Sequence, residues 1–159
     1  GLGTIGYAFP ASLFFESAHQ FVVGTIRDTS PAGLAGGTQG SQRTNLGVRS
    51  TDIDGANFPG TDRSVSVDIR LYDPATGNQV GQTIPVNGLQ PGEVRIVGNV
   101  FSLAQVPSTI SEVIAFVDVR NPTNSSPTIE GFVVGIDNTT QDGSYYEMKC
   151  ADTGFVCGQ

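Results

Sequence analysis

Few side chains in this sequence are suited to acid–base or nucleophilic chemistry. His19 is the only imidazole, and nucleophilic catalysis needs a base beside the nucleophile. The 15 Asp and Glu residues include enough carboxylates for a glycosidase-type pair, but a sequence gives no distance between two carboxylates. No G-x-S-x-G or Walker pattern occurs. The sequence therefore predicts a protein that is not an enzyme, with His19 as a surface residue.

One loop has the oxygen-rich composition of a calcium site. Asp52 and Asp54 precede a glycine, and Asn57 and Asp62 follow it. Alternating carboxylates around a glycine turn can supply the oxygen ligands that Ca²⁺ requires. The acidic residue that closes a helix–loop–helix site is absent, so the alternative is an Asx-rich turn that bonds its own backbone. Calcium is the only cofactor that the sequence suggests.

The two cysteines, Cys150 and Cys157, lie seven positions apart near the end of the chain. Such a pair can close a short disulfide loop, which would contribute roughly 2–3 kcal/mol at most. Two free thiols are the alternative. A zinc site is not expected, because two sulfurs and a distant His19 do not make four ligands.

Two features bear on surface glycans. Asn124 and Asn138 begin N-glycosylation sequons, which we interpret as chance occurrences. A carbohydrate-binding sandwich usually presents planar aromatic side chains on one face. The chain has no Trp, and the sequence offers Tyr72, Tyr145 and Tyr146 as the only platform.

The composition narrows the class of protein before any element is placed. The formal net charge is −7 with eight Lys and Arg residues, which argues against a nucleic-acid partner. No apolar run reaches the roughly 18 residues that span a bilayer, so no membrane span is expected. The 21 glycines, nine prolines and many β-branched residues indicate an all-β domain. The chain begins with Gly1 rather than Met, and we expect a processed leader and an extracellular or cell-surface location.

Period-two alternation with intervening turn signals predicts the elements. We expect strands over residues 20–27, 42–50, 64–73, 79–86, 94–101, 112–120, 128–137 and 144–149, with a short helical piece over 102–111. Residues 74–78 have hairpin composition, and residues 90–93 (QPGE) suit a type II turn. About eight such strands predict an Ig-like or jelly-roll-type β-sandwich, with a barrel as the alternative.

Several of these motifs together resemble a known kind of module. The segments QRTNLGVRS, VSVDIRLYDPATGNQVG, LQPGEV and NTTQDGSY are similar to motifs of β-sandwich modules in bacterial secreted proteins. The resemblance covers roughly residues 20–147. It implies the sandwich fold but says little about function. We accordingly divide the chain into an apolar arm (1–17), a β-sandwich (18–149) and a cysteine loop (150–159).

The arm carries an apolar stripe on alternate residues, which is the pattern of a strand with one buried face. Its large members are Ile5, Tyr7, Phe9, Leu13 and Phe15. Residues 5–15 would extend about 36 Å as a strand, and Pro10 suits an edge position or a bend. Burial of four such side chains would contribute about 6–12 kcal/mol.

Three interpretations of the arm stay open. It is a strand of its own sandwich, a donor strand that inserts into a neighbouring copy, or the remnant of an anchor or leader. We favour the donor strand, which makes the protein a homopolymeric subunit of an extracellular filament or pilus. The architecture is similar to that of donor-strand pilus subunits. The alternative is a monomeric secreted adhesion or carbohydrate-binding domain with a surface glycan as partner.

Overall fold

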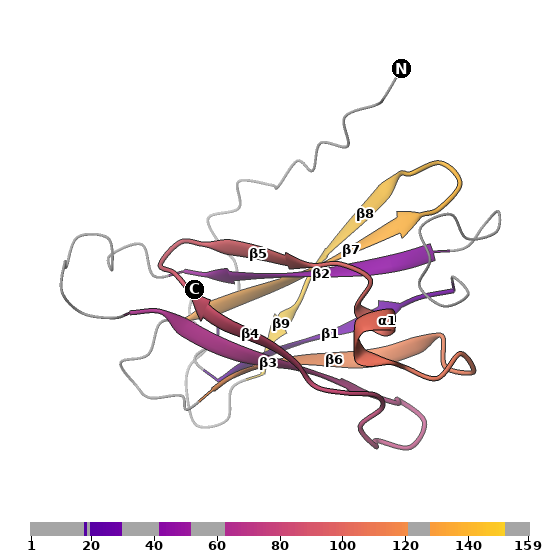
Figure 1. Cartoon of the computed structure of the whole chain (residues 1–159), viewed down its shortest axis with the longest axis horizontal. Coiled ribbons are helices and arrows are strands. Elements are labelled where there is room, and N and C mark those ends of the chain that lie inside the picture. Colours follow the sequence, from indigo (N-terminus) through magenta and orange to yellow (C-terminus); the bar gives the residue numbers. More distant parts are fainter. Residues whose placement is uncertain (1–17, 19, 30–41, 52–62, 121–127, 152–159) are drawn as a thin grey trace.

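The protein is a sandwich of two antiparallel β-sheets, which confirms the predicted all-β fold (Figure 1). The structure, a computed structural model, describes residues 18, 20–29, 42–51, 63–120 and 128–151. All strand pairs among these residues are antiparallel. The extended N-terminal strand expected over residues 1–17 lies outside the described residues.

One sheet has five strands and the other has four. In the order of their pairing, the five are β4 (Ile84–Leu89), β3 (Val65–Tyr72), β6 (Glu112–Val119), β1 (Phe21–Arg27) and β9 (Lys149–Cys150). The four are β5 (Val94–Val97), β2 (Gln42–Ser50), β7 (Ile129–Asp137) and β8 (Gly143–Glu147). A short helix, α1 (Val100–Ala104), follows β5 at one end of the sandwich (Figure 1).

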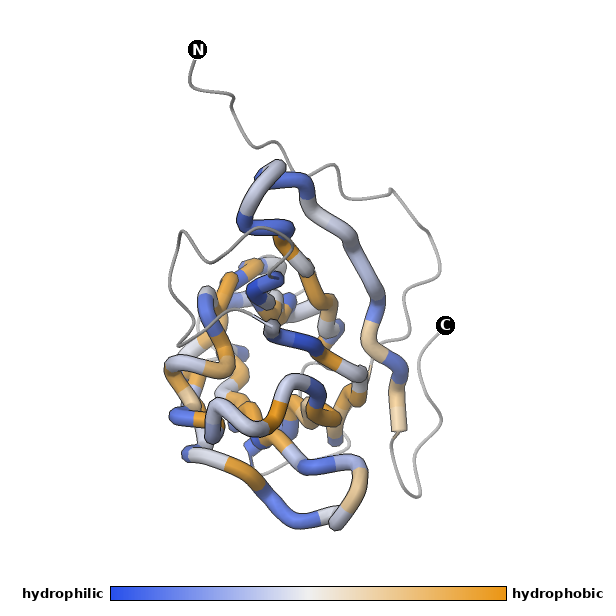
Figure 2. The backbone as a smooth tube through the Cα atoms, turned by 90° about the vertical axis from the view of Figure 1, so that its right-hand side faces the viewer, coloured by the Kyte–Doolittle hydropathy of each residue, from blue (hydrophilic) through white to orange (hydrophobic). Residues whose placement is uncertain are grey.

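The core lies between the sheets and is built from alternate residues of the strands. In β3 the side chains of Val65, Val67, Ile69 and Leu71 are buried, and the residues between them face outward. Apolar and polar positions alternate along the chain in Figure 2. Each fully buried Val, Leu or Ile side chain contributes about 1.5–3 kcal/mol. The side chains of β3 thus alternate between the core and the outer face of the sheet.

Two predicted turns are present with the expected chemistry. Gly92 has φ +73°, and Glu93 N donates to Gln90 O at 2.9 Å, as a type II turn requires. After β3, Gly77 has φ +71° and its N–H donates to Asp73 O at 2.8 Å. Glycine suits both places because it adopts positive φ without a Cβ clash.

The segment from residue 79 to residue 111 differs from the prediction. β4 begins only at Ile84, and β5 ends at Val97 rather than at residue 101. The helix covers Val100–Ala104, which is earlier than the helical piece expected over 102–111. Asn99 and Gln105 adopt the left-handed conformation on either side of the helix. These two residues reverse the direction of the backbone, one between β5 and the helix and one at the end of the helix. The alternation of apolar and polar residues gives no indication of such reversals.

Candidate functional site

Several predicted site residues lie outside the described part of the chain. They are the arm residues Ile5, Tyr7, Phe9, Leu13 and Phe15, the calcium candidates Asp52, Asp54, Asn57 and Asp62, and Cys157. Their roles stay predictions. Within the described residues, no group of three or more His, Cys, Asp or Glu side chains is placed to hold a metal ion.

Cys150 is described and lies in β9, opposite Val22 of β1. The described part of the chain has no free cysteine. Because Cys157 is not described, the pairing of the two cysteines stays a prediction. The strand pairing does place the first cysteine at the edge of the five-stranded sheet.

The expected platform of three tyrosines is wrong. Tyr72 lies on β3 in the five-stranded sheet, whereas Tyr145 and Tyr146 lie on β8 in the other sheet. Tyr145 and Tyr146 also point to opposite faces, because successive residues of a strand alternate. Tyr145 packs on Phe132 with ring centroids 5.5 Å apart, and Tyr146 is 58% exposed. The three rings therefore form no common surface.

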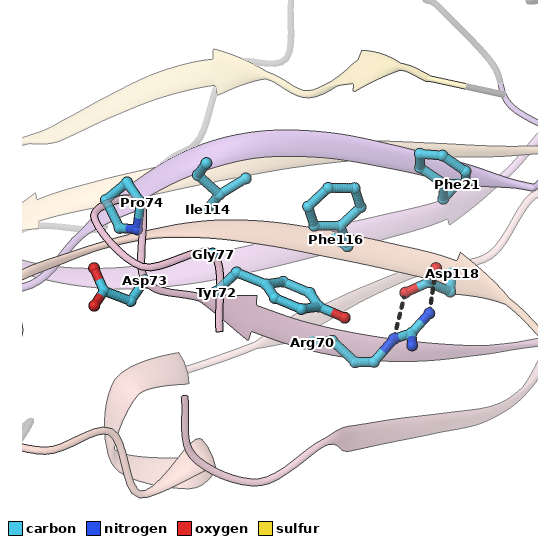
Figure 3. Close-up of a pocket in the computed structure, with 9 residues that line it drawn as sticks. All are labelled: Phe21, Arg70, Tyr72, Asp73, Pro74, Gly77, Ile114, Phe116 and Asp118. Atoms are coloured by element: carbon cyan, nitrogen blue, oxygen red, sulfur yellow. Dashed lines mark hydrogen bonds and ion pairs between the residues drawn. The ribbon is translucent and has the colours of Figure 1, made fainter. Parts of the chain in front are cut away.

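Tyr72 instead helps to form a hollow on the outer face of the five-stranded sheet (Figure 3). The hollow has a volume of about 440 Å³. Its lining comes from β3, β6, β1 and the turn after β3, and comprises Phe21, Arg70, Tyr72, Asp73, Pro74, Gly77, Ile114, Phe116 and Asp118. The strand register places Arg70 opposite Phe116, and Asp118 opposite Phe21. Adjacent strands thus bring together side chains that are far apart in the sequence.

Three aromatic rings cross this face from β3 through β6 to β1. Tyr72 and Phe116 meet edge to face, with centroids 5.2 Å apart and an interplanar angle of 78°. Phe21 and Phe116 are tilted by 45° at a centroid distance of 5.6 Å. Edge-to-face and tilted pairs are favourable aromatic geometries, and they hold the rings in fixed orientations. The result is a partly exposed aromatic surface that is angled rather than flat.

An ion pair borders the aromatic rings. Arg70 Nη2 lies 2.7 Å from Asp118 Oδ1, and Arg70 Nε donates to Asp118 Oδ2 at 2.9 Å. This side-chain hydrogen bond is the main cause that raises the pKa of Arg70 above its ordinary value, against the lowering effect of burial. Two parallel bonds fix both planar groups and leave further N–H groups and carboxylate lone pairs for a ligand.

A second Arg–Asp ion pair, also with no net charge, lies further along the sheet. Arg120 bonds the carboxylate of Asp68, and its Nη1 donates to Asn87 Oδ1 at 2.9 Å. Asp73 accepts from Ala75 N and from the Thr76 hydroxyl, each at 2.9 Å, within its own turn. Each charged group on this part of the face therefore already has a partner of its own.

A second feature lies at the edge of β1. Gln20 O accepts from Val119 N at 2.6 Å, and Asp28 N donates to Ser111 O at 3.0 Å. Because backbone groups alternate between the two sides of an antiparallel strand, the even-numbered residues between them also bond toward β6. The odd-numbered residues of β1 consequently direct their N–H and C=O groups to the opposite edge.

Only the first half of that edge is paired. Phe21 O accepts from Ala151 N at 3.2 Å, and β9 then pairs with β1 as far as Val23. The carbonyl of Arg27 accepts from the Thr44 hydroxyl. The N–H and C=O of Thr25 and the N–H of Arg27 have no partner within the described part of the chain. We call this stretch the open half of β1.

The open half of β1 borders a groove of about 540 Å³ between the two sheets. The far wall is made by β7 and β8, with Val133, Gly135, Ser144 and Tyr146. Arg27 and Glu112 lie at 4.0 Å in the lining on the near side. Val133 and Tyr146 provide its apolar part, and the rest is mostly polar.

Neither site was found from the sequence. Phe21 and Phe116 occupy outward positions of amphipathic strands, where polar side chains are usual, and this break in the alternation was an available signal. The open half of β1 gave no signal in the sequence. It exists because β9 pairs with only part of β1, and Lys149 of β9 lies 126 residues after its partner Val23.

The sequon at Asn138 does not present an accessible acceptor. Asn138 is 7% exposed, and its side-chain oxygen accepts from Arg43 Nη1. The sequon at Asn124 and the single histidine, His19, lie outside the described residues.

The comparisons with known proteins add no relative. No family model, curated protein or solved structure matches the chain. Among the described residues, no helix is long and apolar enough to cross a membrane.

Proposed function

We propose that this protein is a structural subunit of an extracellular filament, not an enzyme. In the proposed assembly, the N-terminal segment of one copy adds as a strand to the open half of β1 in the next copy. The observation that carries the proposal is a set of three backbone groups at Thr25 and Arg27 that have no partner among the described residues and lie beside a groove. An exposed strand edge is a template for pairing with another chain.

The chemistry of the groove supports strand addition. Each backbone hydrogen bond formed there would contribute about 0.5–1.5 kcal/mol. In strand addition the backbone bonds supply affinity, and alternate side chains of the added strand enter pockets. Val133 and Tyr146 offer apolar contact to such side chains. The alternating stripe of Ile5, Tyr7, Phe9, Leu13 and Phe15 has the matching period.

The position of β9 favours a strand from a neighbour over one from the same copy. The described chain enters β1 from Ala18, which is bridged to Ile129 by two backbone hydrogen bonds of 2.8 Å. β9 stands beside Val22 and Val23, between this entry point and the open half of β1. A strand of the same copy would have to pass around β9, whereas a neighbour's strand can enter from the Arg27 end.

A repeated contact of this kind is heterologous and head to tail, so it generates a filament unless the rotation closes a ring. We also propose that Cys150 and Cys157 form a disulfide, since the described chain has no free cysteine. Disulfides persist in oxidising compartments, which fits an extracellular or cell-surface location.

The test is the assembly state of the full chain and of Thr25→Pro. Proline removes the N–H that points to the open edge and places its ring there. The bonds toward β6 belong to Gly24 and Ile26, so the sheet keeps them. We expect concentration-dependent polymers of the unmodified chain in sedimentation velocity and negative-stain microscopy, and monomers of Thr25→Pro.

Thr25→Ala is the matched control, because it shortens the same side chain but keeps the N–H. It should polymerise like the unmodified chain. Far-UV circular dichroism and urea unfolding establish that both variants are folded. An unmodified chain that stays monomeric at every concentration, or a folded Thr25→Pro that polymerises normally, would overturn the proposal.

A further inference from the structure

We propose that the hollow on the outer face of the five-stranded sheet binds a neutral oligosaccharide. This site is separate from the proposed strand-addition edge. The hollow includes Phe21 at the start of β1, and the open half of β1 lies at the other end of that strand. The inference does not depend on the proposed filament, and either can fail alone.

The aromatic surface supplies the apolar half of the recognition. Tyr72, Phe116 and Phe21 follow one another across three strands at centroid distances of 5.2 and 5.6 Å. They are partly exposed, although outward positions of a sheet usually carry polar side chains. The face of a pyranose ring carries C–H groups that pack on aromatic rings. An angled row of rings offers such faces to successive sugars of a chain.

The ion pair supplies the polar half. Arg70 and Asp118 fix each other through two bonds of 2.7 and 2.9 Å, and both remain partly exposed. The guanidinium keeps N–H donors, and the carboxylate keeps acceptor lone pairs. Figure 3 shows the Tyr72 hydroxyl directed toward this end of the hollow. Rigid donors and acceptors side by side match the adjacent hydroxyls of a sugar, each of which both donates and accepts.

The charge balance of the face favours a neutral ligand. Arg70 is paired with Asp118, Arg120 is paired with Asp68, and the Asp73 carboxylate bonds within its own turn. No unpaired cation among these residues is available for a phosphate, sulfate or uronate group. The formal net charge of −7 further disfavours a polyanion.

The size of the hollow is consistent with a small segment of such a chain. Its volume of about 440 Å³ lies within the roughly 300–1,000 Å³ typical of ligand pockets. A wholly apolar ligand would leave the exposed hydrogen-bonding groups of Arg70 and Asp118 without use. A sugar chain uses both the aromatic rings and the ion pair.

The experiment is isothermal titration calorimetry of the full chain with cellohexaose, xylohexaose, mannohexaose and chitohexaose. We expect saturable binding of at least one of these neutral oligosaccharides. Binding should change less than about twofold between 0.15 and 0.5 M NaCl, because no counterions are released. Tyr72→Ala and Arg70→Lys should each weaken it about tenfold. Arg70→Lys keeps the charge but loses the bidentate geometry.

Ile96→Ala is the matched control, since it removes an exposed apolar side chain from the other sheet, outside both proposed sites, and should leave the affinity unchanged. Circular dichroism establishes that each variant is folded. The proposal fails if none of the four oligosaccharides binds at millimolar concentration. It also fails if folded Tyr72→Ala and Arg70→Lys both bind like the unmodified chain, or if only an anionic probe, a heparin hexasaccharide, binds and salt abolishes it.

Discussion

The ring of Phe132 lies across Gly47 on the outer face of the four-stranded sheet, and the two residues are directly opposite in the register of β2 and β7. A Cβ on Gly47 would lie 2.0 Å from Phe132 Cζ. The glycine is thus required by close packing rather than by its backbone angles. The space left by the missing side chain of Gly47 explains why the ring of Phe132, although on an outer face, is only 5% exposed.

Gly47→Ala should therefore destabilise the fold. Overpacking a tight contact costs about 1–3 kcal/mol, and we expect a loss in the upper part of this range. Equilibrium urea unfolding measures it as a lower midpoint. Gly98→Ala is the control, because a Cβ there would meet only Asn45 Oδ1 at 3.5 Å. Equal stabilities of the two variants would show that Phe132 does not occupy the space above Gly47.

Two carboxylates on the four-stranded sheet illustrate opposite electrostatic environments. Burial raises the pKa of Glu130, although Arg49 acts against the shift. Backbone N–H donors of Thr140 and Thr139 lower the pKa of Asp137. At a pH above the ordinary pKa of an aspartate, the ionised Asp137 therefore stabilises this turn. This contribution to stability is lost as the pH falls through the lowered pKa of Asp137.

At the scale of elements, the strands with strict alternation were predictable from the sequence. The bounds expected for β2 agree with the structure, and those for β1, β3, β6 and β7 agree within one residue at each end. β1, β3 and β6 bury one face, so their sequences record the position of the core. β7 has buried side chains on both faces and reads as a continuous apolar run. β4 and β5 are edge strands with weaker alternation. Gly81 precedes the start of β4, and Asn99 follows the end of β5. Both have positive φ angles, which no local sequence pattern predicted.

The site residues were harder to predict than the strands. Tyr72 was among the residues expected at a glycan platform, and it does line the hollow. The partners expected for it, Tyr145 and Tyr146, are in the other sheet. Recognising Phe116 and Phe21 as its neighbours requires the pairing of β3 with β6 and of β6 with β1. That order joins strands up to 97 positions apart, as the pairing of Phe21 with Asp118 illustrates.

The last strand suggests a test of the proposed disulfide. β9 has two residues and includes Cys150, so a disulfide to Cys157 would close a short loop directly after this strand. Replacing both cysteines by serine should lower the free energy of unfolding by about 2–3 kcal/mol in urea titrations. Thiol titration of the unfolded, unreduced chain should find none. Two reactive thiols, or an unchanged unfolding midpoint, would contradict the pairing.

At the scale of the whole molecule, the net charge of −7 opposes self-association. The Debye length falls from about 30 Å at 0.01 M salt to about 8 Å at 0.15 M. An interface made of backbone bonds and apolar side chains should therefore strengthen as salt rises. Light scattering of the full chain should show more polymer at 0.15 M than at 0.01 M NaCl. Dissolution of the polymer by added salt would instead indicate an interface of ion pairs.

The two proposed sites lie on different parts of the sandwich. Strand addition uses the edge of β1 and the groove between the sheets, and oligosaccharide binding uses an outer face. A filament would repeat the hollow along its length, so that weak sites gain avidity toward a long polysaccharide.

The central claim is that residues 5–15 of one copy lie against another copy, and mixed-isotope photo-crosslinking tests it most directly. An unlabelled chain with p-benzoylphenylalanine in place of Phe9 is mixed in denaturant with a ¹⁵N-labelled chain that lacks this group. The mixture is refolded, irradiated and analysed by mass spectrometry. We predict crosslinks from the unlabelled segment to ¹⁵N-labelled peptides of β1 or β8. Crosslinks found only within unlabelled chains at every mixing ratio, although the labelled chain is in excess, would contradict the account.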